Sequence, residues 1–199
     1  MAFWNSANLQ PKRKFRWVLQ WKPPGDTGTT MQIAAKTANK PNYELGSTTH
    51  KFLNHSFFFP NRVEWKPITL TFVDHVGPGV SDGTTDILYK ILGASGYQVP
   101  ASVKSCSSAV TKGKAVRAMG GQVRLVQLGG DEDEVLETWI LTNPWISKVT
   151  FGDLSYEDEG LIEISIDMVY DYARMKSGTK LADVPLIQQA KNAAKGGLG

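Results

Sequence analysis

The sequence predicts a mainly β protein with one helix, and three observations support this fold class. From residue 156 to residue 172, apolar and acidic side chains alternate with a period of two, which is typical of a strand with two unlike faces. Several shorter segments alternate in the same way, whereas only residues 84–94 place apolar side chains at helical spacing. A chain of 199 residues with 41% hydrophobic content can bury one substantial core, so we expect one domain.

Three strands are predicted in the first 74 residues. Residues 15–21 alternate large apolar side chains with others, and a Pro-Pro-Gly sequence then stops the strand. Residues 32–37 can form a second strand. Residues 63–74 form a stronger alternating segment, in which Pro67 indicates an edge position or a bulge because proline cannot donate to a strand ladder.

Residues 40–62 have neither a helical nor a strand period, and we interpret them as an irregular segment. They nevertheless contain three consecutive phenylalanines, Phe57, Phe58 and Phe59. An irregular segment with this much aromatic surface is a liability in a monomer. We therefore expect it to fold back on the core or to dock on a neighbouring molecule.

The second half of the chain begins with the predicted helix at residues 84–94, where Asp86 favours the first turn. Residues 100–121 are rich in small and basic residues and are interpreted as a long surface loop. Residues 122–128 and 135–142 then predict a hairpin. Its tip carries four consecutive acids, which are Asp131, Glu132, Asp133 and Glu134.

The last predicted strand, which residues 145–151 precede, has two chemically opposite faces. One face carries apolar side chains, namely Ile162, Ile164, Ile166, Met168, Tyr170 and Tyr172. The other face is mainly acidic and includes Glu163, Asp167 and Asp171. A row of carboxylates is costly to bury and mutually repulsive, so this face is expected to border water or a water-filled space.

The net charge is only +3, but the charges are unevenly distributed along the chain. Lys12, Arg13, Lys14 and Arg16 lie near the N-terminus without an acid among them, and the C-terminal residues are also basic. Residues 129–173 hold twelve acids against one lysine. This polarity is compatible with self-association through charge complementarity, and equally with solvated charges that have no partner.

Motifs for catalysis or metal binding are weak in this sequence. The glycine-rich residues 77–83 lie between a strand and a helix, but their spacing does not match a dinucleotide fingerprint and predicts a turn. His50, His55 and His75 lack the spacing of a metal pair, and the single Cys106 excludes an internal disulfide. No Ser-His-Asp or Cys-His grouping is visible. We therefore predict no enzyme, no metal site and no cofactor.

The sequence also lacks a run of about eighteen apolar residues that would span a bilayer. Its first residues lack the apolar core of a signal peptide. We therefore expect a soluble protein that is made in the cytoplasm.

The order of these patterns resembles a known family. The most specific parts are a W-x-P-I-T-L-T-F strand at residues 65–72, a V-x-F-x-D-L-x-Y run at residues 149–156, and the final strand with its Tyr-Asp-Tyr end. Through them, residues 12–173 resemble the tail tube proteins of contractile-tailed bacteriophages, a family related to the inner tubes of pyocins and type VI secretion systems. None of these patterns is a catalytic motif.

The resemblance implies a two-sheet antiparallel β-sandwich with one flanking helix. Six copies would form a ring in which strands join a continuous β-barrel, and rings would stack into a hollow tube for DNA ejection. The tail-tube domain would span residues 1–173, with an N-terminal arm at 1–14 and an inter-subunit loop at 40–62. A basic extension at 174–199 and the length of that loop depart from the simplest tube protein, so a tube initiator or terminator stays open.

The implied partners are other copies of the chain, the tail sheath, the baseplate or tube initiator, the tail terminator and the tape measure protein. DNA would pass without specific binding, and no membrane is implied. The protein would be assembled in the host cytoplasm and located in the virion tail. Two other classes of function remain: a baseplate or adhesin module that binds a different partner, and a nucleic-acid-binding protein that uses its basic ends.

Two sets of site residues are hypotheses at this point. Glu163, Asp167 and Asp171 are predicted to face the lumen, where an acidic lining would repel DNA phosphates; the alternative is that they face external solvent. A second set is predicted to make contacts between subunits, and it comprises Lys12, Arg13, Lys14, Arg16, Phe57, Phe58, Phe59, Asp131, Glu132, Asp133 and Glu134.

Overall fold

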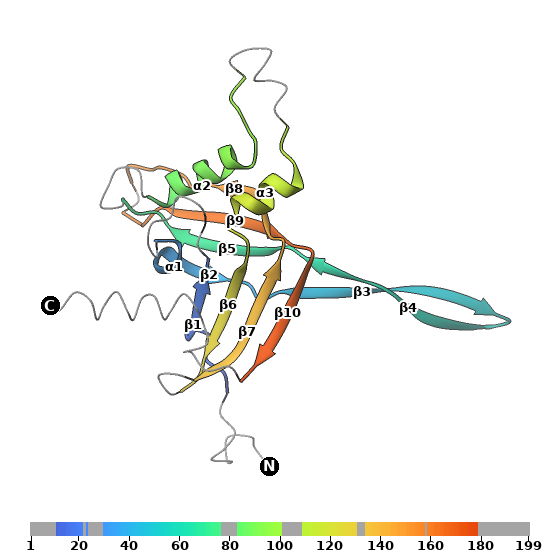
Figure 1. Cartoon of the computed structure of the whole chain (residues 1–199). Coiled ribbons are helices and arrows are strands. Elements are labelled where there is room, and N and C mark those ends of the chain that lie inside the picture. The colour runs from blue at the N-terminus through green and yellow to red at the C-terminus, as the bar shows by residue number, and fades with distance from the viewer. Residues whose placement is uncertain are drawn as a thin grey trace.

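Two four-stranded antiparallel sheets and one long hairpin make up the β structure of the described residues (Figure 1). The computed structural model describes residues 11–21, 23, 30–76, 83–100, 109–130, 134–157 and 159–178. The prediction of a mainly β, two-sheet antiparallel fold is confirmed.

Sheet I has the strand order β1-β6-β7-β10. Its strands are β1 (Trp17–Gln20), β6 (Val123–Leu128), β7 (Val135–Thr142) and β10 (Tyr172–Ser177). The predicted first strand and the predicted hairpin of β6 and β7 are both confirmed. β10 was not predicted as a separate strand, because Tyr172 continues the apolar parity of the preceding segment.

Sheet II has the order β2-β5-β9-β8. Its strands are β2 (Ala35–Ala38), β5 (Ile68–Val73), β9 (Glu163–Val169) and β8 (Trp145–Thr150). The edge position inferred from Pro67 is wrong, because β5 pairs with β2 on one side and with β9 on the other. Pro67 lies just before β5 and ends the preceding strand instead.

The predicted last strand is shorter than expected, since β9 covers only Glu163–Val169. Its alternation is confirmed there: Ile164, Ile166 and Met168 are fully buried, whereas Glu163 is exposed. Residues 156–162 lack strand structure in the described part of the chain. The alternation of apolar and polar side chains seen in β9 continues along part of this segment, but its described residues pair with no neighbouring strand.

Three helices occur in the described residues, α1 (Thr30–Ala34), α2 (Thr84–Ala94) and α3 (Lys112–Ala118). Helix α2 was predicted at the same bounds. The single-helix prediction is wrong, because α3 lies in the segment interpreted as a loop and α1 in part of the predicted second strand. Helix α3 buries only alanines and is capped by the Thr111 hydroxyl, which accepts from the Lys114 N–H, so it shows no stripe of large apolar residues.

The core lies between the sheets and under α2. Sheet I contributes Leu19, Val123 and Leu141, all nearly inaccessible to solvent. Facing them are apolar side chains of sheet II and of α2, namely Ile68, Leu70, Phe72, Ile164, Ile166, Met168, Ile87, Leu88 and Ile91. Helices α2 and α3 close the sandwich at the end drawn uppermost in Figure 1.

The irregular segment predicted at residues 40–62 is instead a long β-hairpin formed by β3 (Asn42–Phe52) and β4 (His55–Lys66). It projects away from the sandwich (Figure 1). Nearly every residue along it is exposed, so no buried face imposes an apolar alternation on the sequence. That is why the strand period was not visible.

The base of the hairpin is attached to the sandwich by an aromatic cluster. The ring of Trp65 lies 5.4 Å from that of Tyr43 and 6.0 Å from that of Tyr170, measured between centroids. Tyr170 is nearly buried at the end of β9, and this burial raises the pKa of its hydroxyl to about 12. The hairpin therefore starts from the Tyr170 end of sheet II.

Several predictions fall outside the described residues. These are the turn at 77–82, Cys106, the acids Asp131, Glu132 and Asp133, most of the N-terminal arm, and the C-terminal extension beyond residue 178.

Candidate assembly surfaces

The distal part of the β3–β4 hairpin exposes aromatic side chains on both faces. Phe57, Phe58 and Phe59 are 46%, 70% and 56% exposed. Phe57 and Phe59 pair across the strands with His50 and Thr48 on one face, while Phe58 pairs with Thr49 on the other. A two-stranded element with this much aromatic surface lacks a hydrophobic contact of its own.

The outward face of sheet II is polar and accessible. One cross-strand row consists entirely of hydroxyl side chains, in the order Thr37, Thr71, Ser165, Thr150. The next row pairs Thr69 with Asp167 and Asp167 with Lys148. We call this surface the hydroxyl face.

The carboxylates of the hydroxyl face have basic or hydroxyl partners. Glu163 forms an ion pair with Lys36, and Asp167 accepts a hydrogen bond of 2.8 Å from the Thr69 hydroxyl. Asp167 also lies opposite Lys148 in the strand register. The charges of these two acids are therefore balanced by two lysines, and the face is close to neutral.

Asp171 does not belong to this face, contrary to the prediction that it continues the strand. It lies in the turn between β9 and β10, where it accepts from Lys112 Nζ at 2.6 Å and from Asn143 Nδ2 at 2.8 Å. These hydrogen bonds, chiefly that of Lys112, lower the pKa of its carboxyl. The chain reverses after Tyr170, so a parity count across this position fails.

The outward face of sheet I differs from the hydroxyl face. Val126 and Val135 form a second buried apolar cluster there, with Leu128 packed against it. Gln20 and Thr138 on the same face are also buried. Of the two outward sheet faces, the one on sheet II is the more open to solvent.

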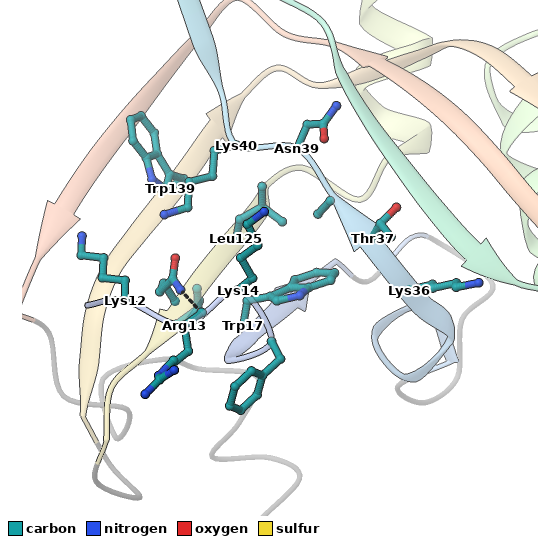
Figure 2. Close-up of a pocket in the computed structure, with 14 residues that line it drawn as sticks. Lys12, Arg13, Lys14, Trp17, Lys36, Thr37, Asn39, Lys40, Leu125 and Trp139 are labelled. Carbon is teal, nitrogen blue, oxygen red and sulfur yellow. Dashed lines mark hydrogen bonds between the residues drawn. The ribbon is translucent and has the colours of Figure 1, made fainter. Parts of the chain in front are cut away.

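A basic cleft opens between the two sheets at the end away from α2 and α3 (Figure 2). Its volume is about 740 Å³. The apolar part of its wall includes Trp17, Leu125 and Trp139. The charged part of the wall contains the basic residues Lys12, Arg13, Lys14, Lys36 and Lys40.

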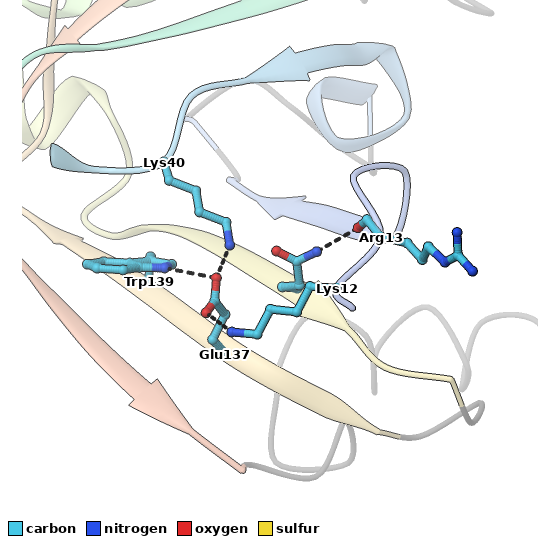
Figure 3. A network of polar contacts seen from close by, with 6 residues as sticks. Lys12, Arg13, Lys40, Glu137 and Trp139 are labelled. Carbon is cyan, nitrogen blue, oxygen red and sulfur yellow. Dashed lines mark hydrogen bonds and ion pairs between the residues drawn. The ribbon is translucent and has the colours of Figure 1, made fainter. Parts of the chain in front are cut away.

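Glu137 is the buried acid at the edge of this cleft (Figure 3). Lys12 Nζ donates to it at 2.6 Å, Lys40 pairs with its other oxygen, and the indole of Trp139 donates at 3.3 Å. Burial raises the pKa of Glu137, but the hydrogen bonds from the two lysines and the charge of Lys40 outweigh it and lower the pKa to about 2. The network ties the N-terminal segment and the β2–β3 connection to sheet I.

Two of the four predicted N-terminal bases already have partners within the chain. Lys12 binds Glu137, and Arg16 donates to the carbonyl oxygen of Gly129 at 2.7 Å. The guanidinium of Arg13 extends away from the Glu137 network (Figure 3). Glu134, the described end of the acidic tip, accepts from the Gly130 N–H at 3.0 Å.

The sequence analysis did not find Glu137, Lys36 or Lys40. Glu137 shares its strand parity with Trp139 and Leu141, whose side chains face inward. An acid at a core-facing position was the available signal for a buried ion pair. No signal in one sequence brings Lys12 and Lys40 to the same carboxylate.

The described residues contain no group of three metal-ligating side chains that could hold an ion. None of their helices is long and apolar enough to cross a membrane.

Comparison with family models gives no match, and no curated protein matches the chain. Solved structures do match. A chain of the anti-feeding prophage cap, described as the tube terminating cap, is 14% identical with a TM-score of 0.59, over 89% of this chain and 99% of that one.

Two further matches come from PVC, an extracellular contractile injection system. A chain of its sheath/tube terminator in the extended state is 15% identical with a TM-score of 0.58, over 86% of this chain and 100% of that one. A chain of its sheath-tube complex is 16% identical with a TM-score of 0.56, over 89% and 99%. The chain therefore has a tail-tube-related fold, and the fold that the sequence resemblance implied is confirmed.

Proposed function

We propose that this protein is a structural component of a contractile tail machine and that it self-assembles into six-membered rings that stack into the inner tail tube. The fold supports this proposal because chains of similar structure occur in tube, sheath-tube and terminator assemblies.

The single observation that carries self-assembly is the projecting hairpin. Its exposed aromatic side chains have no hydrophobic partner of sufficient size within the described residues. Burying them against another copy would supply roughly 25 cal/mol for each Å² of apolar surface removed from water. The Trp65 cluster at its base packs the hairpin against the sandwich and leaves the distal part projecting for that contact (Figure 1).

Ring closure would use the edges of the sheets. In the described chain, β1 and β10 are the edges of sheet I, and β2 and β8 are the edges of sheet II. Joining edges between neighbouring copies satisfies their backbone groups and removes a site of uncontrolled pairing. In a continuous barrel around the ring, the edge strands of every copy would be paired with those of its neighbours.

The hydroxyl face of sheet II is the proposed wall of the channel. It is polar, open and almost neutral, so it offers phosphates few cations to bind. Glu163 and Asp167 would line the lumen, whereas Asp171 would lie in the turn that leads from β9 to β10. DNA would pass without specific binding, and the tail sheath, initiator, tape measure and terminator proteins would be the other partners in the virion tail.

Assembly is tested by replacing Phe57, Phe58 and Phe59 together with serine and measuring sedimentation and electron micrographs of the purified protein. Wild-type protein should form rings or tubes, and the variant should remain a folded protomer or a single ring. Tyr89→Ser with Leu92→Ser removes exposed apolar side chains from α2 and serves as the matched control. Normal tubes from the hairpin variant would contradict the role of the hairpin.

A tube terminator is a second candidate, favoured by the likeness to a tube terminating cap and to a sheath/tube terminator. A terminator would form one ring that does not stack on itself. The same micrographs of the wild-type protein separate the two roles, since single rings at every concentration indicate a terminator and growing tubes indicate a tube protein.

A further inference from the structure

The β8–β9 loop, which connects Thr150 to Glu163, also exposes large apolar side chains. Tyr156 is fully exposed, and Leu154 and Leu161 are 84% and 76% exposed. The same loop carries Asp153, Glu157 and Glu159, all exposed and without an ion-pair partner among the described residues. The loop therefore exposes both apolar and acidic side chains.

The distal hairpin has the complementary character. From residue 47 to residue 60 its ionisable groups are Lys51, His50 and His55, with no acid among them. His50 lies opposite Phe57 in the strand register, and His55 has the same strand parity as Phe57 and Phe59. All four side chains therefore lie on one face of the hairpin. An aromatic surface with basic groups fits an apolar surface with acidic groups better than it fits another copy of itself.

The two surfaces lie at opposite ends of sheet II. Tyr170, just after β9, packs on Trp65 at the base of the hairpin. At the other end of β9, the Ile162 carbonyl accepts from the Asp74 N–H and Glu163 pairs with Lys36, so the loop leaves the sheet there. Figure 1 shows the hairpin projecting from one side of the sandwich and the loop between β8 and β9 on the other.

We propose that the hairpin of one copy docks on the β8–β9 loop of the next copy. Unlike surfaces at opposite ends of one molecule form a head-to-tail contact, which propagates instead of stopping at a dimer. Phe57 and Phe59 bury the apolar side chains of the loop, and His50 and His55, which share their hairpin face, lie against its carboxylates. This inference rests on the proposed self-assembly and assigns the receptor for the hairpin.

The direct test is photo-crosslinking in the assembled protein. Phe57 is replaced by p-benzoylphenylalanine, because its side chain lies on the hairpin face that carries the two histidines. The assembled protein is irradiated, and crosslinked peptides are identified by mass spectrometry. The expected crosslink joins residue 57 to a peptide within residues 151–162 of another copy. A crosslink to any other surface, with normal assembly, overturns the receptor while leaving self-assembly intact. Protein that never associates overturns both proposals.

A second variant measures the same contact from the other side. Leu154→Ser with Tyr156→Ser should weaken association of copies at least about tenfold, as does loss of aromatic anchors at other interfaces. Val99→Ser with Val110→Ser is the matched control, because these exposed side chains lie outside both surfaces. Equal association of the loop variant and the wild type overturns the proposal. Thermal unfolding of the loop variant should match the wild type, since its two side chains are solvated in the protomer.

Discussion

The sandwich body and the β3–β4 hairpin follow different constraints, although they are parts of one chain. In β9 Ile164, Ile166 and Met168 are buried and the polar side chains between them are accessible, because one face packs on sheet I. In the hairpin, phenylalanines occur on both faces and almost all are exposed. The body thus holds residues that stabilise the protomer, whereas the hairpin holds residues whose burial requires a second molecule.

Among the variants that test this comparison, a core substitution should have the largest effect on the free energy of unfolding. Phe72→Ala removes a fully buried ring of β5 and should lower the free energy of unfolding by about 3–5 kcal/mol. Phe58→Ala, in the hairpin, should change it by about 0.5 kcal/mol or less, since its side chain is exposed in the protomer. Urea unfolding of the two variants, made under conditions that keep the protein monomeric, checks this difference. Similar losses would show that the hairpin contributes to the protomer core.

The Glu137 network should give an intermediate effect with a distinct pH dependence. Since the native pKa of Glu137 is about 2, its stabilising effect is present above the ordinary pKa of 4.5 and is lost as the pH falls from there towards 2. Glu137→Gln should cost on the order of 1–3 kcal/mol at pH 7. The difference from wild type, measured by urea unfolding, should shrink at pH 3. Glu44→Gln, at an exposed hairpin ion pair, is the control with little effect at either pH.

The hydroxyl face should tolerate charge but alter DNA passage. Changing Glu163 and Asp167 to lysine should permit assembly, because both residues lie on the accessible hydroxyl face. Each ring would then present additional cations to phosphates, so genome ejection from particles that carry the variant should slow down. Ejection at the normal rate would indicate that these residues do not face the channel.

The smallest effect is expected at the basic N-terminal segment. Arg13→Glu with Lys14→Glu should leave unfolding unchanged and slow assembly, with exposed pairs contributing about 1 kcal/mol or less each. The wild-type rate should fall as salt is added, because screening weakens contacts with the acidic tip of a neighbour. Assembly that responds neither to salt nor to this reversal would leave the segment with only its contacts inside the chain.

Sequence reasoning succeeded where a core imposes a pattern. The strands β1, β6, β7 and β9 and the helix α2 all bury a face of large apolar residues, and each was predicted. Helix α3 was missed because its buried residues are alanines, which leave no apolar stripe. The hairpin was missed because its strands, apart from the Trp65 cluster at their base, pair with each other and bury no face.

The site residues were harder to predict than the fold. The aromatic hairpin residues were selected for their unexplained apolar surface, and the structure exposes them. The position of Asp171 was misjudged because parity cannot detect the turn at which β9 ends. Glu137 was overlooked because its partners, Lys12 and Lys40, are distant in sequence and converge only in the folded chain.

The central claim is that this chain forms a tube whose channel is lined by sheet II. Cryo-electron microscopy of the purified, assembled wild-type protein tests it most directly. We expect stacked sixfold rings with the row of Thr37, Thr71, Ser165 and Thr150 facing the channel and each hairpin seated on the β8–β9 loop of another copy. A reconstruction with this row on the outer wall, or protein that stays monomeric at high concentration, would contradict the account.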